Sequence, residues 1–397
     1  MTPQRLIMLA FFLQPVAFGS WLPRIPDVAQ RLGLGPAELS LTLIGLPVGI
    51  GVTLPFAGPL VARIGSHNAI RYGFIAYPLL VCLPVFAFHP IALYVALLLV
   101  GISISTLELG LNVAADEVEK SGGKPVMSTC HGFWSLGVMT GNLAGSALAA
   151  LHLPPEASVP IVAVIVFLAA LPLGRALPPS AAALAGQKDE KASPFFLPGL
   201  VLLGICVFAF GTTMAEGAAG DWSAIYLRQV FGAGPAAAGL GYAIFAGLVA
   251  LGRFLGDWLK VRFGPVAIAR ATALTALIGF LILFVSPSYT VALAGFALGG
   301  IGVSVSFPLA VTAAAGLGDR PAAQNVAILS LLGLSGFLIG PPLIGFVAQN
   351  FGMRWGLMVL VPGLVLSVLL AGLLRRGLPR AVSSEAIAKA SVAGSGE

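Results

Sequence analysis

The feature that most limits how this chain can fold is a series of long apolar stretches separated by short polar breaks. A transmembrane helix needs about 20 consecutive and mostly apolar residues. The stretches that reach this length are 5–26, 39–61, 69–88, 91–114, 125–150, 157–177, 197–217, 236–258, 266–286, 290–315, 323–348 and 355–376. Their apolar runs are continuous, whereas the strands of a membrane barrel alternate over about 10 residues. The sequence therefore predicts an all-α membrane protein with twelve transmembrane helices.

The composition excludes a soluble protein. Of the 397 residues, 58% are hydrophobic and 9% are charged, whereas a soluble domain carries roughly 25% charged residues. The net charge of +6 comes from basic residues scattered between the apolar stretches, which is typical of membrane topology and not of a nucleic-acid surface. We therefore expect a lipid bilayer around the chain and no nucleic-acid partner. Cys82, Cys130 and Cys206 lie within apolar stretches without metal-ligand spacing, so no metal is expected.

The lysines and arginines predict the orientation. With the N-terminus inside, all but four of the 21 basic residues fall on cytoplasmic segments or helix ends, and the four are Arg24, Arg31, Arg228 and Arg354. Membrane proteins carry an excess of lysine and arginine on their cytoplasmic side. Both termini are therefore expected in the cytoplasm.

The chain divides into two similar parts. A polar break at 178–194 predicts a cytoplasmic linker over 178–196 between two six-helix bundles, 1–177 and 197–378, followed by a disordered cytoplasmic tail over 379–397. The basic turn at 63–65 returns about 199 residues later at 262–264, and the glycines of 137–145 return in 336–345. Two such bundles in the same orientation are parallel repeats, a design that places the substrate between them near the midplane.

The turn after the second span resembles a family motif. Gly58-Pro-Leu-Val-Ala62-Arg63-Ile-Gly65 is similar to the cytoplasmic G-x-L-x-D-R-x-G motif of the major facilitator superfamily, with Ala62 in place of the aspartate. The stretch 252–264 looks like a second copy and keeps an acid, Asp257. The resemblance covers nearly the whole chain and implies the major facilitator fold. It also implies a cytoplasmic latch, whose candidate residues here are Arg63, Arg253, Asp257 and Arg262.

Four further stretches narrow the resemblance. They are 21–26, 111–114, 125–137 and 216–227. Together they are similar to YbjJ-type permeases of the bacterial inner membrane, which are distantly related to sugar–proton symporters of the fucose permease kind. This likeness implies an inner-membrane permease and brings no firm substrate.

Two ionisable residues fall inside neighbouring spans. Glu108 lies about two turns before the short charged turn at 115–125, and His131 lies a similar distance after it. Ionisable groups at this depth are costly and mark proton or substrate pathways, so both are candidates for proton coupling. The alternative is a structural hydrogen bond between helices. Asn112 is one turn from Glu108 on the same helix face and either contacts substrate or braces another helix.

A second polar group lies near the outer ends of the first and seventh spans. Arg24 lies near the outer end of the first span, and Glu216 and Asp221 lie near the outer end of the seventh. Because these spans are equivalent in the repeat, we expect an outer gate in which Arg24 contacts Glu216 or Asp221. Ordinary anchoring of charges at the interface is the alternative. Glu216 is also a candidate for the substrate cavity, together with Gln14, Asn112 and Trp134, although simple packing is the better explanation of the tryptophan.

The sequence has no G-x-x-x-x-G-K-[ST] loop for ATP, no G-x-S-x-G or H-E-x-x-H motif and no paired-cysteine cluster. We therefore predict no enzyme and no cofactor. The leading interpretation is a monomeric secondary transporter that moves a small polar organic solute by alternating access, coupled to protons. The alternatives are a proton-driven drug or metabolite exporter of the same fold and a membrane sensor that binds a ligand without moving it.

Overall fold

The structure, a computed structural model, describes residues 1–122, 126–177 and 198–377, and these residues are almost entirely helical. In the first half the elements are α1 (Pro3–Trp21), η1 (Leu22–Arg24), α2 (Ile25–Arg31), α3 (Pro36–Leu43), α4 (Gly45–Ile64), α5 (Ser66–Leu80), η2 (Leu83–Phe86), α6 (Pro90–Gly122), α7 (Met127–Ala150) and α8 (Pro155–Ala176). In the second half they are α9 (Leu200–Phe231), α10 (Pro235–Phe263), α11 (Pro265–Val285), α12 (Tyr289–Val303), α13 (Ser306–Ala315), α14 (Ala322–Leu334), α15 (Gly336–Phe351), α16 (Met353–Met358), α17 (Leu360–Leu370) and η3 (Ala371–Gly377).

Several of these elements are pieces of one bent span. Joined end to end, the described elements form twelve helical segments, as the apolar stretches predict. Eleven of the segments are long and apolar enough to cross a membrane. The remaining one, α7, has 24 residues, which give it a length of about 36 Å, and it packs between α1 and α10. The twelve helical segments predicted from the sequence are therefore present in the described residues, six in each half.

The two halves repeat the same local structure. The turns that end α4 and α10 each contain a glycine with positive φ, 84° at Gly65 and 80° at Gly264. A residue with a side chain rarely adopts this conformation, which explains why both copies of the basic turn end in glycine. The equivalence predicted from the sequence offset is confirmed here in the backbone.

Glycines also bring the helices of each half together. On α7, the glycines of 137–145 face backbone carbonyl groups of α1, and on α15 Gly336 faces Phe210 and Met214 of α9. Small residues in this spacing allow membrane helices to approach closely. The fifth and eleventh spans therefore pack on the first and seventh in the same way, which fixes the position of the first and seventh spans near the boundary between the halves.

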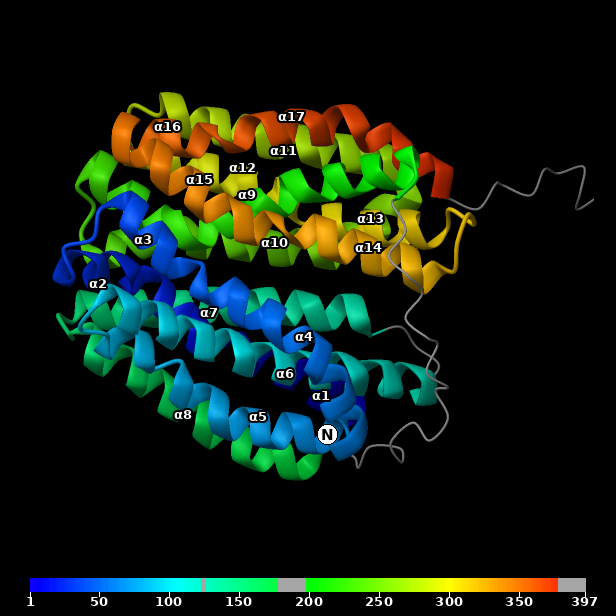
Figure 1. Ribbon diagram of the computed structural model, residues 1–397, viewed down its shortest axis with the longest axis horizontal. Helices are drawn as coiled ribbons and strands as arrows, with labels where there is room; N and C mark the ends of the chain where they lie inside the picture. Colours follow the sequence, from blue (N-terminus) through cyan, green and yellow to red (C-terminus); the bar gives the residue numbers. More distant parts are fainter. Residues whose placement is uncertain (123–125, 178–197, 378–397) are drawn as a thin grey trace, which may run out of the picture.

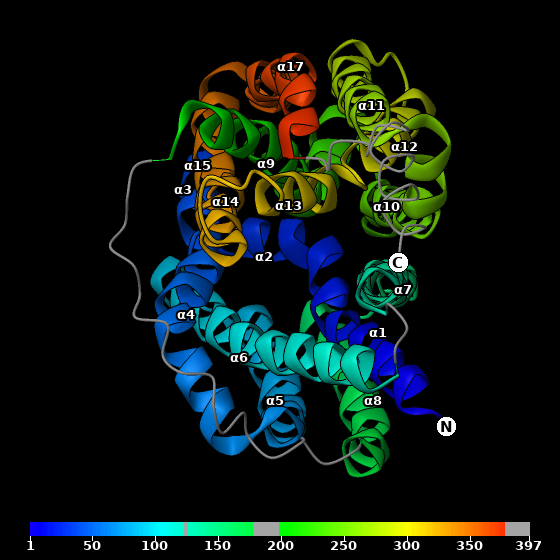
Figure 2. The ribbon, with the colours of Figure 1, turned by 90° about the vertical axis from the view of Figure 1, so that its right-hand side faces the viewer.

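Figure 1 shows the first half below the second, with the N-terminus at one end of the bundle. We call that end the N-terminal face and the other end the opposite face. In Figure 2 the N-terminal face is turned toward the viewer. The links between α4 and α5 and between α10 and α11 lie at the N-terminal face, and the links between α2 and α3 and between α9 and α10 lie at the opposite face.

The halves meet along two seams that differ in extent. Along the first seam, α7 and α10 run side by side, with Ser146 at Gly239, Met139 at Gly247 and Phe254 at Gly132. Along the second seam, α3 packs on α15, and α4, which continues α3 toward the N-terminal face, has only a marginal contact with α15. Additional contacts of α2 and η1 with α9 lie near the opposite face. The halves are therefore joined most completely at the opposite face.

The close packing of α7 on α1 yields a stability prediction. A Cβ atom at Gly141 would lie 2.8 Å from the carbonyl carbon of Val16, whereas a Cβ atom at Gly51 would meet nothing within 4 Å. We expect Gly141→Ala to lower the free energy of unfolding by about 1–3 kcal/mol, as overpacking does. The matched control Gly51→Ala is expected to be neutral or slightly stabilising, because alanine is the better helix former. Unfolding of both purified variants in detergent measures this, and equal stability would contradict it.

Candidate functional site

An arginine is held inside the bundle between three helices. Nη2 of Arg253, on α10, lies 3.0 Å from Oε1 of Glu216 on α9. Its Nη1 donates a hydrogen bond of 2.6 Å to the Ser135 hydroxyl on α7, which belongs to the other half. The Arg253 and Glu216 side chains are 14% and 17% exposed. A charge in such a place is tolerated when it is paired and hydrogen-bonded.

The depth of this pair follows from the helix geometry. Arg253 lies ten residues before Phe263, the last residue of α10, which places it about 15 Å from that end of the helix. The hydrocarbon core of a membrane is about 30 Å thick. Arg253 therefore lies deep in the bundle. The motif resemblance predicted a cytoplasmic latch for Arg253, and in the structure this side chain contacts Glu216 and Ser135 inside the bundle.

The two other arginines proposed for the latch differ from Arg253 in their exposure. Arg63 and Arg262 are exposed, next to the glycine turns. The guanidinium of Arg262 lies 6.0 Å from the centre of the Phe263 ring. The side chain of Asp257 lies outside the part of the structure that is described. An arginine–aspartate latch on the N-terminal face therefore stays a prediction.

Glu108 and His131 lie near this central pair. Arg253 acts electrostatically on both, so α6, α7 and α10 bring the three ionisable groups into one neighbourhood. Within the described chain, no hydrogen bond or ion pair reaches the carboxyl group of Glu108. The His131 ring packs edge-on against Phe11, with ring centres 5.4 Å apart. No described hydrogen bond joins Glu108 to His131. Glu108 lies 14 residues before the end of α6 and His131 lies four residues after the start of α7, so their common depth and a direct contact between them both stay predictions.

The polar side chains predicted to line a cavity are used partly for bracing. Asn112 donates to the backbone oxygen of Glu108 at 2.9 Å, within its own helix. Trp134 donates its indole N–H to Oε1 of Gln14 at 2.8 Å, which ties α7 to α1. Gln14 is 1% exposed, whereas Trp134 is half-buried. Trp134 therefore fixes the buried amide of Gln14 and keeps part of its ring accessible.

Two tyrosines that the sequence analysis did not single out belong to the same neighbourhood. The hydroxyl of Tyr77, on α5, accepts a hydrogen bond of 3.2 Å from the backbone N–H of Phe18, next to the position where Pro15 interrupts α1. Tyr242, on α10, lies within the electrostatic influence of Glu216, Asp221 and Arg253. Neither tyrosine stands in a sequence motif that would have singled it out.

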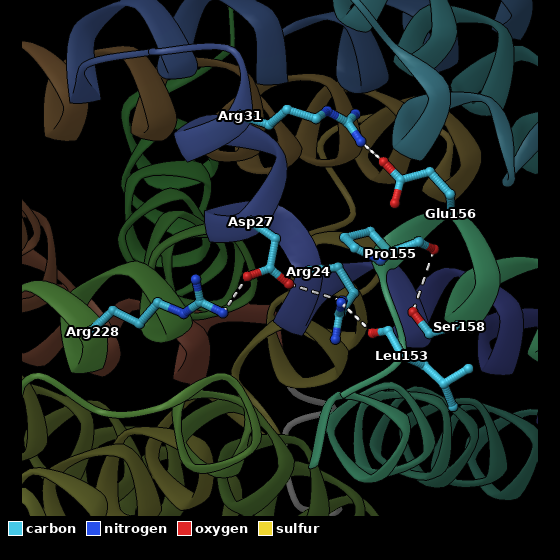
Figure 3. Close-up of polar contacts among 8 residues, drawn as sticks. All are labelled: Arg24, Asp27, Arg31, Leu153, Pro155, Glu156, Ser158 and Arg228. Carbon is cyan, nitrogen blue, oxygen red and sulfur yellow. Dashed lines mark hydrogen bonds and ion pairs between the residues drawn. The ribbon is translucent and has the colours of Figure 1, made fainter. Parts of the chain in front are cut away.

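A second ionic cluster lies at the opposite face (Figure 3). Asp27, on α2, lies 2.9 Å from Nε of Arg24 and also forms an ion pair with Arg228 of α9. Arg24 donates a hydrogen bond of 2.9 Å to the backbone oxygen of Leu153. The pair between Asp27 and Arg228 joins the two halves. The predicted contacts of Arg24 with Glu216 or Asp221 are not found, because Asp27 takes their place.

A nearby ion pair stays within the first half. Arg31, on α2, pairs with Glu156 of α8 and donates to the backbone oxygens of Val85 and Ala87, at 2.7 and 3.0 Å. Figure 3 shows this pair beside the Asp27 cluster. Asp221 lies on α9 between Glu216 and Arg228 in sequence, is partly exposed, and receives no hydrogen bond or ion pair from the residues that the structure describes.

The fold and the site together define a class of protein. The described chain is a multi-pass helical membrane protein in two repeated halves, with buried ionic groups at the boundary between them. The described residues contain no group of three or more His, Cys, Asp or Glu side chains that could hold a metal ion.

Comparisons with known proteins define the family. The model of the Major Facilitator Superfamily matches residues 7–265 and 201–393. An uncharacterised MFS-type transporter of Yersinia pestis is 32% identical over 342 residues, which are 86% of this chain and 88% of that protein. An uncharacterised transporter of Sinorhizobium fredii is 31% identical over 362 residues, which are 89% and 93% of the two chains. The chain belongs to the Major Facilitator Superfamily, and it is a membrane transporter and not an enzyme.

Solved structures agree with this fold. The inward-facing, occupied structure of a bacterial homologue of the human lysosomal transporter Spinster matches with a TM-score of 0.72 at 18% identity, over 95% of this chain and 98% of that one. The nucleoside transporter NupG matches with a TM-score of 0.68 at 14% identity, over 96% and 100%. At these identities the likeness concerns the fold alone. The resemblance to YbjJ-type permeases stays a prediction.

The central ion pair yields a second prediction. Arg253→Gln leaves the carboxylate of Glu216 without its cation, and we expect the free energy of unfolding to fall by about 3 kcal/mol. Adding Glu216→Gln is expected to recover part of the loss, because the unpaired charge is then gone. Chemical unfolding of the purified variants in detergent measures both.

The matched control for this prediction is Lys120→Gln. Lys120 pairs with Asp116 at 2.7 Å on the surface of α6, where the two side chains are 70% and 51% exposed. Such a pair contributes about 0.3–0.5 kcal/mol. If Lys120→Gln and Arg253→Gln cost the same, or if the double variant is no better than Arg253→Gln, the central pair does not have the structural role described.

Proposed function

We propose that the protein is a secondary transporter that moves a small polar organic solute by alternating access, coupled to protons. The observation that carries this proposal is the Arg253–Glu216 pair, buried between the halves and hydrogen-bonded to Ser135 of the other half. Glu108 and His131 lie within its electrostatic influence. Ionisable groups inside a membrane protein mark ion and substrate paths, and here they gather where the family's repeated halves meet.

The chemistry of the central residues supports a polar solute. Arg253 offers donors, Glu108 and Asp221 offer carboxyl groups without described partners, and Trp134 and Tyr242 offer partly accessible aromatic rings. A solute with several hydrogen-bonding groups satisfies such a site better than a lipophilic compound does. Because Glu108 has no cation bound to it in the described chain, it is free to exchange a proton as the surroundings change. His131, whose imidazole ring can bind and release a proton, is the second coupling residue that we propose.

The arrangement of the halves supports alternating access. The Asp27–Arg228 pair and the packing of α3 on α15 close the opposite face, whereas α4 and α15 separate toward the N-terminal face. We propose that the halves, 1–177 and 197–378, rock against each other and that this arrangement is open toward the N-terminal face. By the distribution of lysine and arginine, the N-terminal face is the cytoplasmic side of a bacterial inner membrane, with both termini inside.

Transport by purified protein in liposomes tests the coupling. Sugars, amino acids, organic acids and amphipathic cations are offered with and without an inward proton gradient, to the wild type and to Glu108→Gln. We expect one solute to accumulate only with the gradient, and Glu108→Gln to lose accumulation while keeping exchange. The matched control is Glu38→Gln, since Glu38 is exposed at the opposite face and accepts from the backbone N–H of Gly35 at 3.2 Å. Normal coupling in Glu108→Gln would remove Glu108 from the mechanism.

Cross-linking tests the movement of the halves. In a background without Cys82, Cys130 and Cys206, Asp27→Cys with Arg228→Cys places two thiols across the boundary between the halves. We expect oxidation to block uptake and reduction to restore it, because the opposite face must open in each cycle. Arg31→Cys with Glu156→Cys is the control, since that pair lies within the first half. Uptake that continues after the two introduced thiols have formed a disulfide across the boundary contradicts alternating access at this face.

A further inference from the structure

A small cavity lies between the halves at the opposite face, apart from the central site. Its volume is about 240 Å³, and α2, α3 and α9 line it. Arg228, Gln30 and Gln229 supply its polar groups, and Leu34, Leu39 and Ile225 supply apolar surface. Residues from both halves therefore form one cavity.

The cavity adjoins an excess of positive charge. Asp27 is shared by Arg24 and Arg228, so one carboxylate faces two guanidinium groups, and the charge of Arg228 acts on Arg24. The Arg24 side chain is 4% exposed, and its Nη1 has no hydrogen-bond partner among the described atoms. Two arginines with one acid leave the cluster with one uncompensated positive charge.

The other acids near this face are occupied. Glu156 is paired with Arg31, and Glu38 accepts a hydrogen bond from the backbone N–H of Gly35. Asp221 lies seven residues before Arg228 on α9, which is about 10 Å along the helix. A partly buried cation without a full counter-charge attracts an anion, and arginine binds carboxylates through two parallel hydrogen bonds.

We propose that this cavity is a binding site for a small amphipathic organic anion, whose carboxylate pairs with Arg228 and whose apolar body rests on Leu34, Leu39 and Ile225. Pockets for drug-sized ligands measure roughly 300–1,000 Å³, so the occupant is smaller than a drug. Because the site needs both halves in contact, a bound anion stabilises the arrangement in which the opposite face is closed. The site goes beyond the proposed function, since binding there requires no transport and no proton gradient.

Binding to the purified full-length protein in detergent tests the site, with benzoate as the probe and benzamide as its neutral counterpart. We measure saturable binding by calorimetry, with protein-free micelles as the blank. Benzoate is expected to bind and benzamide to bind at least about tenfold more weakly, because one charge-assisted hydrogen bond is worth that factor or more. Equal binding of the two compounds, or no saturable binding of benzoate, overturns the proposal.

Three variants locate the site. Arg228→Gln is expected to weaken benzoate binding about tenfold or more, and Arg228→Lys, which keeps the charge, to weaken it less. Leu34→Trp fills the cavity while leaving the three charges of the Asp27 cluster in place, so it is expected to abolish binding independently of them. The matched control is Arg31→Gln, which removes one positive charge from α2 at a position outside the cavity. If Arg31→Gln loses benzoate binding as much as Arg228→Gln, or if Leu34→Trp binds normally, the anion is held elsewhere.

Discussion

The cost of a charge inside a membrane protein is the constraint on which the rest of this structure depends. An ion moved away from water loses several kcal/mol of solvation, which only close partners offset. The chain meets this constraint by placing its buried charges at the boundary between the halves, where helices from two or three directions supply partners. Arg253 has Glu216 beside it on α9 and Ser135 across the boundary on α7. The glycines that let α7 lie directly on α1 set the spacing within which such contacts form.

The large features of the fold could be predicted because they repeat along the sequence. The twelve spans follow from the lengths of the apolar stretches, and the two glycine turns follow from the offset between the halves. The first signal depends on composition, and the second depends on a backbone conformation that only glycine readily adopts. Predictions made from them stay correct even when a helix boundary is misplaced by one or two residues.

The partners within the site could not be predicted in this way. Adjacent residues on a helix point about 100° apart, so a small error in register changes which side chains meet. That Glu108 and His131 lie inside neighbouring helices was readable, since it follows from the apolar stretches around them. The choice of Asp27 over Glu216 as the partner of Arg24 was not, because it depends on how η1 and α2 turn after Trp21. The pairing of Arg253 with Glu216 was not readable either, because the turn motif does not indicate which side chains meet inside the bundle.

The pairing pattern keeps the carboxylates of Glu216 and Asp27 each beside an arginine of the same half. If the central contact opens, Arg253 keeps Glu216 in its own half and loses only the neutral hydroxyl of Ser135. If the opposite face opens, Asp27 keeps Arg24 in its own half. Of these arginines, only Arg228 then loses its ion pair, with Asp27, and it lies near the end of α9, where water can reach it. Glu216 and Asp27 thus each have an arginine within the same half, and the contacts that cross the boundary are the Ser135 hydrogen bond and the Asp27–Arg228 pair.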